Sequence, residues 1–555
     1  MLMRDYSSIS DMFKPSSVWT MLVLAVLSSI ITICLSYKFL QALQQKGYVC
    51  SDYFKWISKK NNVFNSRVIM LSLLSTFAFC LYNAVFAFID NDFFTLSGFV
   101  FYLLFALMYI LGEKKMENKV PLKFTSRIKR LLVTYFIISV VVFFGLIVGF
   151  NALCYLIPFN FLKVVRFSVV CLLPLLMPIT IFVASIFNKP IERVIRKKFI
   201  ALATERLNRE NLIKIGITGS YGKTSVKNFL TTILQEKYKV VATPLSFNTP
   251  LGIAKSTELL QDDTEVFIAE MGARRVGDIR ELCDIVKPNV SVLNGVIGAH
   301  LLTFGSIEKV VKTKYEVMES LSEDGLGVFT CDNENTLELY NKFSGNKILA
   351  GINNQGCAGV FAKDISSSKD GSTFTLVVDG EEVACQTKLL GKHNISNLTL
   401  AVAVAKKLGL TISQIQSAIH KIEPVEHRLS LIQKNGVTII DDAYNSNAEG
   451  IKSALEVLEF FNGRKIIVTP GMTELGLEQN KKNYDFGVML ASVVDYAFLV
   501  EGGSCNAIRD GMVFGGGFNH NNVKIVANLT VAKDKLKDFI KEGDIILFEN
   551  DLTDC

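Results

Sequence analysis

Long apolar stretches in the first third of the chain constrain its fold most strongly. Each of the five approaches or exceeds the roughly 20 residues that a helix needs to cross a hydrocarbon core of about 30 Å. The stretches are Val18–Leu40, Val68–Ile89, Phe94–Leu111, Leu131–Ile157 and Phe167–Phe187. No Asp, Glu or Lys lies deep within a stretch, as an ion pathway or a proton relay would require. We therefore expect residues 1–190 to form an anchor of five transmembrane helices, although a groove for a lipid-linked substrate stays open.

Cations in the connections between these stretches predict an orientation. Lys and Arg are concentrated in alternate connections and after the fifth stretch, whereas the other connections contain few. The cation-rich positions are Lys46, Lys55, Lys59, Lys60 and Arg67, then Lys114, Lys115, Lys119, Lys123, Arg127, Lys129 and Arg130, then Lys189, Arg193, Arg196, Lys197 and Lys198. The pattern places the N-terminus outside and everything after Phe187 in the cytoplasm. The first stretch lacks a basic leader and a clear cleavage site, so we expect a retained helix rather than a signal peptide.

The formal net charge of +7 does not indicate a nucleic-acid partner, because most of the surplus cations flank the apolar stretches. The eleven cysteines are scattered without a C-x-x-C pair, and the five histidines form no HExxH pattern. A disulfide framework or a zinc site would need clustered spacing. We therefore expect free thiols in a reducing compartment and no nucleic acid.

A phosphate loop is predicted directly after the membrane part. The apolar strand pattern of residues 212–218 leads into GSYGKTS, residues 219–225, and then into a helical pattern over Val226–Leu234. In this context Gly219 and Gly222 let backbone N–H groups approach phosphates, and the helix N-terminus adds partial positive charge. Lys223 would span the β and γ phosphates, and the Thr224 hydroxyl would ligate Mg²⁺. Since Ile217 stands at the first glycine of the commonest pattern, a simple turn before an ordinary helix is the alternative.

Polar residues recur in order along the rest of the chain. The strand pattern FIAEMGA ends in the carboxylate of Glu270, and catalytic residues collect at such carboxyl edges of open sheets. The later motifs are GAHL with His300, KTKYE with Lys314, GKHNISN with His393, Asn394 and Asn397, EHRL with Arg428, and IDDAYNSN with Asp441, Asp442, Tyr444, Asn445 and Asn447. Each has an ordinary alternative: a core histidine, a solvated helix face or a strand end. Their combination and order favour a functional site.

This ordered set resembles the Mur ligase family of ATP-dependent amide-forming ligases over roughly residues 210 to 555. Within the family, EMGA, DDAYNSN and PGMTELG are most similar to the members that add D-alanyl-D-alanine to peptidoglycan precursors. The resemblance implies that the carboxylate receives the γ-phosphoryl group of ATP and that an amine attacks the resulting acyl phosphate. Such transfer depends on charge neutralisation and positioning more than on acid–base chemistry.

The resemblance also implies a role for each matching residue. Catalytic roles fall to Lys223, Lys314, His300 and Arg428. The nucleotide would contact Gly219, Gly222, Lys223, Thr224, Ser225, Asn394, Asn397, Arg428 and Asp442, with adenine at the two asparagines and the last two residues arriving on domain closure. Two Mg²⁺ ions would be held by Thr224, Glu270, His300 and Lys314, the lysine as a carbamate formed with CO₂.

Three departures leave the acceptor open. Asn294-Gly295 stands where the family commonly has Thr-Asn before the histidine motif. The five-stretch membrane part occupies the place of the soluble domain that grips the UDP-sugar. The segment Leu547–Asp551 lacks the Lys-Gly-Ser-like ending expected of the D-alanyl-D-alanine-adding members. The reaction type therefore carries over, whereas the amine and the acceptor, UDP-linked or lipid-linked, are not determined.

The prediction is a multi-pass enzyme of a bacterial plasma membrane. It joins an amino acid or dipeptide, such as D-alanyl-D-alanine, to a muramoyl-peptide carboxylate with ATP and Mg²⁺. One alternative is a poly-γ-glutamate-type or other envelope polymer synthetase, and another is a non-catalytic membrane scaffold with a Mur ligase fold.

The expected architecture is a helical transmembrane bundle followed by α/β domains. Residues 1–190 form the bundle, 200–425 a mostly parallel phosphate-loop sheet, and 426–555 a smaller α/β domain hinged near Pro424. Residues 359–389 alternate in polarity between turn signals and predict antiparallel strands. The glycine-rich segment Gly502–Gly517 is expected to be a mobile loop and is assigned no chemistry.

Overall fold

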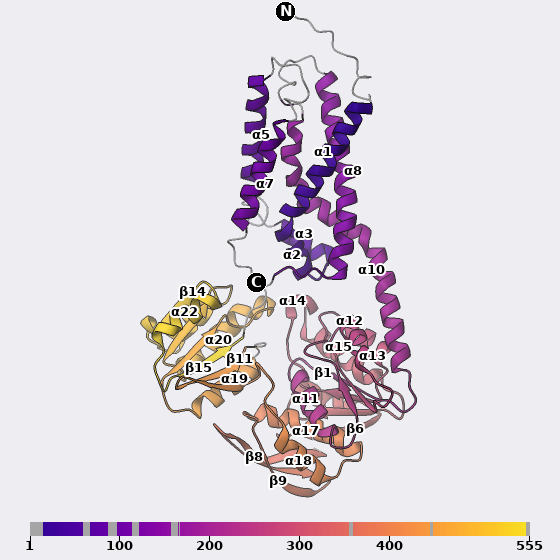
Figure 1. Ribbon diagram of the computed structural model, residues 1–555. Helices are drawn as coiled ribbons and strands as arrows, with labels where there is room; N and C mark the ends of the chain where they lie inside the picture. The colour runs from indigo at the N-terminus through magenta and orange to yellow at the C-terminus, as the bar shows by residue number, and fades with distance from the viewer. Residues whose placement is uncertain are drawn as a thin grey trace, which may run out of the picture. The chain divides into compact units, whose positions relative to one another are not determined.

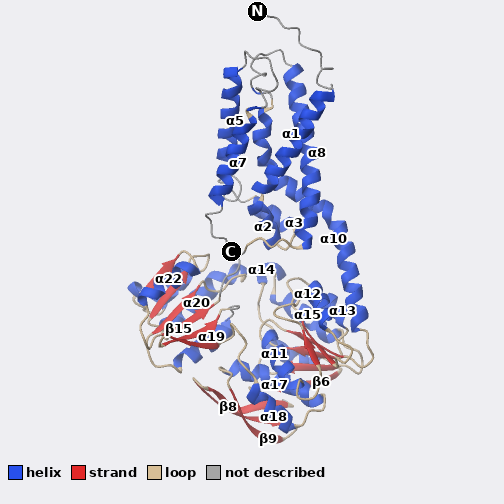
Figure 2. Cartoon of the chain, in the orientation of Figure 1, coloured by secondary structure: helices blue, strands red, loops and turns tan. Residues whose placement is uncertain are grey.

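The protein consists of two compact units that divide between Ile195 and Arg196. The structure, a computed structural model, describes residues 15–58, 67–86, 97–113, 121–156, 165, 167–353, 359–443 and 448–550. In the described residues the first unit is helical (Figure 1), and the second combines helices with two sheets (Figure 2).

Apolar helices make up the first unit. They are α1 (Pro15–Leu35), α2 (Tyr37–Gln45), α3 (Cys50–Ile57), α5 (Arg67–Phe86), α7 (Phe99–Glu113), α8 (Ser126–Leu156), the short 3₁₀ helix η2 (Ser168–Leu176) and the first part of α10 (Met177–Leu207). Helix α1 packs against α7 and α8, and α7 packs against α5. Four described stretches are long and apolar enough to cross a membrane: Ser17–Leu35, Val68–Val85, Ser126–Leu153 and Ser168–Leu207.

The third predicted stretch falls short of a membrane span in the described residues. It forms α7, whose 15 residues rise only about 22 Å at 1.5 Å per residue. The helix formed by the first predicted stretch, α1, ends at Leu35. The last residues of that stretch, up to Leu40, belong to the separate helix α2. The ends Ile89 and Ile157, the start Phe94, and the cations Lys59, Lys60, Lys114, Lys115 and Lys119 lie outside the described residues. A fifth spanning helix therefore stays a prediction.

The first unit buries several small polar side chains and exposes several large apolar ones. On α5, Ser72 is fully buried, whereas Phe77 is 67% exposed. Helix α8 repeats the pattern, with Ser139 buried and Val141 exposed. Small polar groups on the inside and large apolar groups on the outside are typical of helices that face lipid.

The larger sheet of the second unit positions the phosphate loop. Its strand order is β2 (Val240–Ala242), β3 (Val266–Glu270), β1 (Ile213–Thr218), β4 (Val290–Leu293), β5 (Leu326–Thr330), β6 (Asn346–Gly351), β7 (Val360–Ser368), β8 (Gly371–Val378) and β9 (Glu381–Thr387). Pairing is parallel from β2 to β7 and antiparallel from β7 to β9. This confirms the mostly parallel sheet and the predicted antiparallel strands within residues 359–389.

Helices cover both faces of this sheet. One apolar core includes α11 (Lys223–Leu234), α17 (Lys392–Lys407) and α18 (Ile412–Lys421). The other includes α12 (Pro250–Ser256), α13 (Asp278–Val286), α15 (Ile307–Glu319) and α16 (Glu334–Lys342). Alternate residues of β3 enter the two cores, Val266 and Ile268 in one and Phe267 and Ala269 in the other. A strand buried on both faces explains the continuous apolar run in the sequence.

A second sheet organises the C-terminal part. Its order is β10 (Ser430–Lys434), β11 (Val437–Asp442), β15 (Ile545–Glu549), β12 (Lys465–Thr469), β13 (Tyr496–Val500) and β14 (Val523–Val526), with only the β10–β11 pair antiparallel among these described strands. Its helices are α19 (Ala448–Glu459), α20 (Gln479–Ala491), α21 (Cys505–Asp510) and α22 (Leu529–Phe539). The smaller α/β domain that the sequence predicts therefore has a mostly parallel sheet of its own.

The prediction of a loop over Gly502–Gly517 is wrong. Most of this segment is helical: α21 runs into a π-helical turn, η5 (Gly511–Gly515), and both pack against α20. A Cβ added at Gly511 would stand 2.1 Å from the Tyr484 carbonyl oxygen, and one at Gly516 would stand 2.2 Å from the Ala491 Cβ. The glycines therefore serve close helix packing rather than mobility.

Candidate functional site

The phosphate-loop segment joins β1 to α11 at the carboxyl edge of the larger sheet. Helix α11 begins at Lys223, three residues before the predicted start, and Gly222 caps it with a left-handed φ of 71°. A Cβ at Gly222 would stand 2.1 Å from Asn294 Nδ2 and 2.3 Å from Asn397 Oδ1. Those two amides are joined by a 2.6 Å hydrogen bond donated by Asn294. Only glycine fits here, because both the backbone angle and the surrounding space exclude a side chain.

The side chain of Lys223 folds back on the loop. Its Nζ donates a 2.8 Å hydrogen bond to the carbonyl oxygen of Gly219. Burial lowers the pKa of Lys223, the nearby Glu270 carboxylate opposes that shift, and the positive charge of Arg428 adds to it. Ser225, in the first turn of α11, is buried. The predicted phosphate-binding residues are thus gathered around one helix N-terminus.

Glu270 is the centre of a buried polar cluster. It ends β3, pairs with Ile217 of β1 in sheet register and is 1% exposed. Its Oε2 accepts a 3.0 Å hydrogen bond from Thr224 Oγ1, so two of the predicted metal ligands lie in contact. Its Oε1 lies 3.3 Å from the donor Asn248 Nδ2.

Sequence reasoning missed Lys227 in this cluster. Its Nζ lies 3.1 Å from Glu270 Oε2, and both side chains are 2% exposed. Lys227 follows Lys223 by one helical turn on α11, so the two lysines share one helix face. That spacing was the available signal, since a lysine on the buried face of a helix needs an acidic partner.

Lys314 lies on α15 and is 4% exposed. Burial lowers its pKa well below the ordinary lysine value, and the charge of Lys223 lowers it further, against the opposing effects of Asp278, Glu316 and Glu270. In the part of the chain that the structure describes, no hydrogen bond or ion pair holds its Nζ. Burial and the charge of Lys223 therefore favour the neutral amine, which is the nucleophilic form of a lysine.

His300 does not meet Glu270 through a described contact. It precedes α14 (Leu301–Phe304) in a left-handed conformation with φ of 54°, and its Nδ1 contacts the carboxylate of Glu474. Glu474 belongs to the PGMTELG segment of the C-terminal part, and its carbonyl also accepts a 3.3 Å hydrogen bond from Leu302 N. The described residues contain no group of three or more His, Cys, Asp and Glu side chains suited to a metal ion. The metal role of His300 therefore stays a prediction.

The two predicted adenine-contacting asparagines have different surroundings. Both lie on α17 and are nearly fully buried. Asn394 Nδ2 donates to the carbonyl oxygen of Leu390 at 2.9 Å, whereas Asn397 contacts Asn294 beside the phosphate loop. Burial lowers the pKa of the adjacent His393 to about 4, so this histidine is neutral at pH 7.

The C-terminal part contributes the predicted pair Arg428 and Asp442. The charge of Arg428 lowers the pKa of Lys223, His393 and Asp442, so these three groups feel the same guanidinium charge. Burial nevertheless raises the pKa of Asp442 to about 7. The neighbouring Asp441 is joined to His427 Nδ1 by a 2.7 Å hydrogen bond. Tyr444, Asn445 and Asn447 of the same motif lie outside the described residues.

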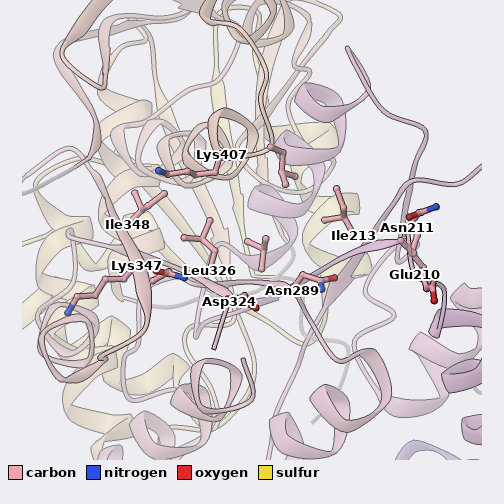
Figure 3. Close-up of a pocket in the computed structure, with 13 residues that line it drawn as sticks. Glu210, Asn211, Ile213, Asn289, Asp324, Leu326, Lys347, Ile348 and Lys407 are labelled. Carbon is pink, nitrogen blue, oxygen red and sulfur yellow. The ribbon is translucent and has the colours of Figure 1, made fainter. Parts of the chain in front are cut away.

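A pocket of about 660 Å³ lies at the opposite edge of the sheet (Figure 3). It is lined at the amino ends of four strands, including Ile213 of β1, Leu326 of β5 and Lys347 of β6. The described residues that line it include none of the predicted site residues. The phosphate-loop cluster is therefore a separate site.

Two family profiles match the second unit. Residues 217–405 match the Mur ligase middle domain, and residues 427–549 match the profile described as Mur ligase, glutamate ligase domain. These matches cover more than half of the 555 residues and follow one another in chain order.

Curated relatives carry one enzyme name. The UDP-N-acetylmuramoyl-tripeptide–D-alanyl-D-alanine ligase of Haemophilus influenzae is 30% identical over 267 residues, which are 47% of this chain and 58% of the relative. The ligase of the same name from Mycobacterium tuberculosis strain CDC 1551 is 30% identical over 372 residues, which are 63% of this chain and 72% of the relative. The chain thus spans less than two thirds of the Haemophilus relative and more of the mycobacterial one.

Solved structures of ligases with the same fold are also similar to this chain. MurF from Acinetobacter baumannii is 26% identical with a TM-score of 0.58, over 64% of this chain and 77% of that one. The MurF ligase from Thermotoga maritima in complex with ADP is 26% identical with a TM-score of 0.57, over 64% and 80%. From its two domain matches, its sheet order and its phosphate-loop geometry, the chain belongs to the Mur ligase family.

Proposed function

We propose that this protein is a membrane-anchored, ATP-dependent ligase of peptidoglycan precursor synthesis. It joins the amine of D-alanyl-D-alanine to the carboxylate of a UDP-muramoyl-tripeptide. The observation that carries the proposal is the Thr224–Glu270 contact beside a loop in which Gly222 leaves no room for a side chain. Relatives named for this amine and this acceptor support the choice of substrates.

The reaction proceeds in two balanced steps. The acceptor carboxylate oxygen attacks the γ-phosphorus of ATP, and the bond to the β–γ bridging oxygen breaks, giving an acyl phosphate and ADP. The amine then attacks the acyl carbon, loses a proton and expels inorganic phosphate, leaving an amide. Lys223 and the N-terminal N–H groups of α11 bind the phosphates, and Arg428 compensates charge from the C-terminal part.

The residues of the cluster fit Mg²⁺. A hydroxyl and a carboxylate, those of Thr224 and Glu270, lie side by side at the loop, and oxygen donors are what this ion prefers. When bound, Mg²⁺ would neutralise the phosphate charge. Lys314 is suited to become a further oxygen donor, because burial favours its neutral amine, which can attack CO₂ and release a proton to give a carbamate.

The apolar helices support a location in a bacterial plasma membrane. Four described stretches have the length and composition to cross it. The distribution of cations supports an external N-terminus and a cytoplasmic second unit, where ATP is available.

The experiment is phosphate release by the detergent-purified full chain. UDP-muramoyl-tripeptide and lipid-linked muramoyl-peptide are offered in turn with D-alanyl-D-alanine, D-alanine or glutamate. Release stimulated by the UDP acceptor with D-alanyl-D-alanine, and lost in Lys223→Ala, is the expected result. Stimulation only by glutamate would instead indicate a polymer synthetase, stimulation only by the lipid acceptor would change the substrate, and no stimulation by any pair would support a scaffold.

A further inference from the structure

Lys227 is a buried cation that the proposed reaction does not use. It lies on α11, one helical turn beyond Lys223, and its side chain is 2% exposed. Its Nζ contacts Glu270 Oε2 at 3.1 Å and also donates to the carbonyl oxygen of Leu245. One ammonium group therefore joins the end of β3 to the loop that follows β2.

That loop, residues 243–249, makes two further hydrogen bonds with Glu270 and one with the backbone of Gly272. Thr243 Oγ1 accepts from Glu270 N at 3.1 Å, and Asn248 Nδ2 donates to Glu270 Oε1 at 3.3 Å. The Asn248 carbonyl accepts from Gly272 N at 3.0 Å. Both carboxylate oxygens of Glu270 are thus held, one by an amide and the other by the Lys227 ammonium and the Thr224 hydroxyl.

Leu245 shows that the loop is constrained. Its φ is 46°, in the left-handed region that a leucine rarely adopts, and its side chain is 80% exposed. Packing cannot hold so exposed a side chain in this conformation. The Leu245 carbonyl accepts a hydrogen bond from Lys227, which is one of the contacts that hold this loop.

We propose that Lys227 is a positioning residue for Glu270, which it orients toward the divalent cation while fixing the 243–249 loop beside it. This inference rests on the proposed function. A buried carboxylate needs a charged or hydrogen-bonding partner, and groups that orient a metal ligand raise the affinity of the site. The opposite effect is also physical, since an ammonium near the site repels a cation. If Lys227 acts by positioning Glu270, removing its charge weakens metal binding. If it acts mainly by repelling the cation, removing its charge strengthens metal binding.

Mn²⁺ binding to the full chain in detergent distinguishes positioning by Lys227 from repulsion by Lys227. Free Mn²⁺ is measured by its electron paramagnetic resonance signal, in the presence of a non-hydrolysable ATP analogue, so no turnover is needed. The matched control is Lys312→Met, which removes an exposed lysine from α15. Lys227→Met is expected to weaken Mn²⁺ binding about 10- to 100-fold, and Lys227→Arg, which keeps charge and donors, to restore most of it. Unchanged or tighter binding in Lys227→Met would overturn the proposal.

A double substitution keeps the test decisive if Lys227→Met does not fold. Glu270→Gln and Lys227→Met/Glu270→Gln both lack the buried carboxylate charge. Because Lys227 acts through Glu270, the two should bind Mn²⁺ with the same affinity, and a further loss in the double variant would overturn the proposal. A wild-type chain that binds Mn²⁺ with these effects but forms no amide would contradict only the proposed reaction. One that binds nucleotide but no Mn²⁺ would contradict both.

Discussion

At the scale of single residues, position 222 accepts only glycine, because of both its backbone angle and its neighbouring side chains. We expect Gly222→Ala to lower the free energy of unfolding and to reduce binding of a fluorescent ADP analogue, because the new Cβ meets Asn294 and Asn397. Gly277→Ala is the matched control, since Gly277 also has a positive φ, 89°, but nothing within 4 Å. The control should show only the left-handed strain of about 1–2 kcal/mol. Equal losses of stability in the two variants would contradict the crowding argument.

We predict that the buried amine of Lys314 forms an adduct with carbon dioxide. Lys314→Met should reduce phosphate release at least about 100-fold, as expected for loss of a group that stabilises developing charge, whereas Lys312→Met on the same helix should not. Intact-mass analysis under bicarbonate should find one added CO₂ in the wild type and none in Lys314→Met. Because burial lowers the pKa of Lys314, a larger share of its amine is neutral than in an ordinary lysine, which favours the adduct at this residue. An adduct of equal abundance in both proteins would refute the assignment.

The raised pKa of Asp442 predicts how the stability of the protein depends on pH. Burial raises its pKa from 3.8 to about 7, so between these values the folded protein holds a proton that the unfolded chain has released. Stability should therefore fall as pH rises from about 4 to 7, and Asp442→Asn should flatten that fall and raise the melting temperature above pH 7.

His393 changes the pH dependence of stability in the opposite direction to Asp442 over part of the same pH range. Its pKa is lowered from 6.5 to about 4, so the unfolded chain binds the extra proton and stability rises with pH. The informative quantity is thus the difference between the wild-type and Asp442→Asn melting curves. A difference that stays independent of pH between about 4 and 8 would show that Asp442 titrates normally.

At the scale of elements, the close packing of α20 against α21 depends on a glycine. A Cβ at Gly487 of α20 would stand 2.1 Å from the Ile508 carbonyl oxygen of α21, whereas one at Gly503 would meet only a side chain at 3.6 Å. Gly487→Ala should destabilise the protein by about 1–3 kcal/mol through overpacking, and Gly503→Ala should leave the melting temperature nearly unchanged. Similar melting temperatures for both variants would contradict the close-packing argument.

At the scale of the whole molecule, the apolar helices predict membrane residence with a fixed orientation. The protein should stay in the membrane pellet after alkaline carbonate extraction. In inverted vesicles, which expose the cytoplasmic face, protease should remove the second unit, and in right-side-out vesicles it should not. Cleavage of the second unit from right-side-out vesicles would reverse the predicted topology.

Local signals in the sequence determine much of this protein. The apolar stretches, the strand–glycine–helix context of Lys223 and the alternating pattern before residue 390 each lie within a short window, where hydrophobic periodicity and turn chemistry act. They predict the fold class, the phosphate-loop context and the antiparallel strands. The helical segment from Cys505 to Gly515, formed by α21 and η5, was predicted wrongly as a loop, because tertiary packing overrides the local preference of its glycines.

Only the tertiary structure decided which distant side chains meet. Lys227 and Glu270 lie on separate elements that no local pattern pairs, yet the parallel pairing of β1 with β3 brings them within 3.1 Å. The contact of His300 with Glu474 and that of Asn294 with Asn397 likewise join separate elements. Contacts of this kind depend on strand order and helix packing, which arise from burial over the whole unit rather than from any one segment. The sequence by itself therefore determined the fold class, most of the elements and the family, and the packing of the sheet and its helices decided the partners within the site.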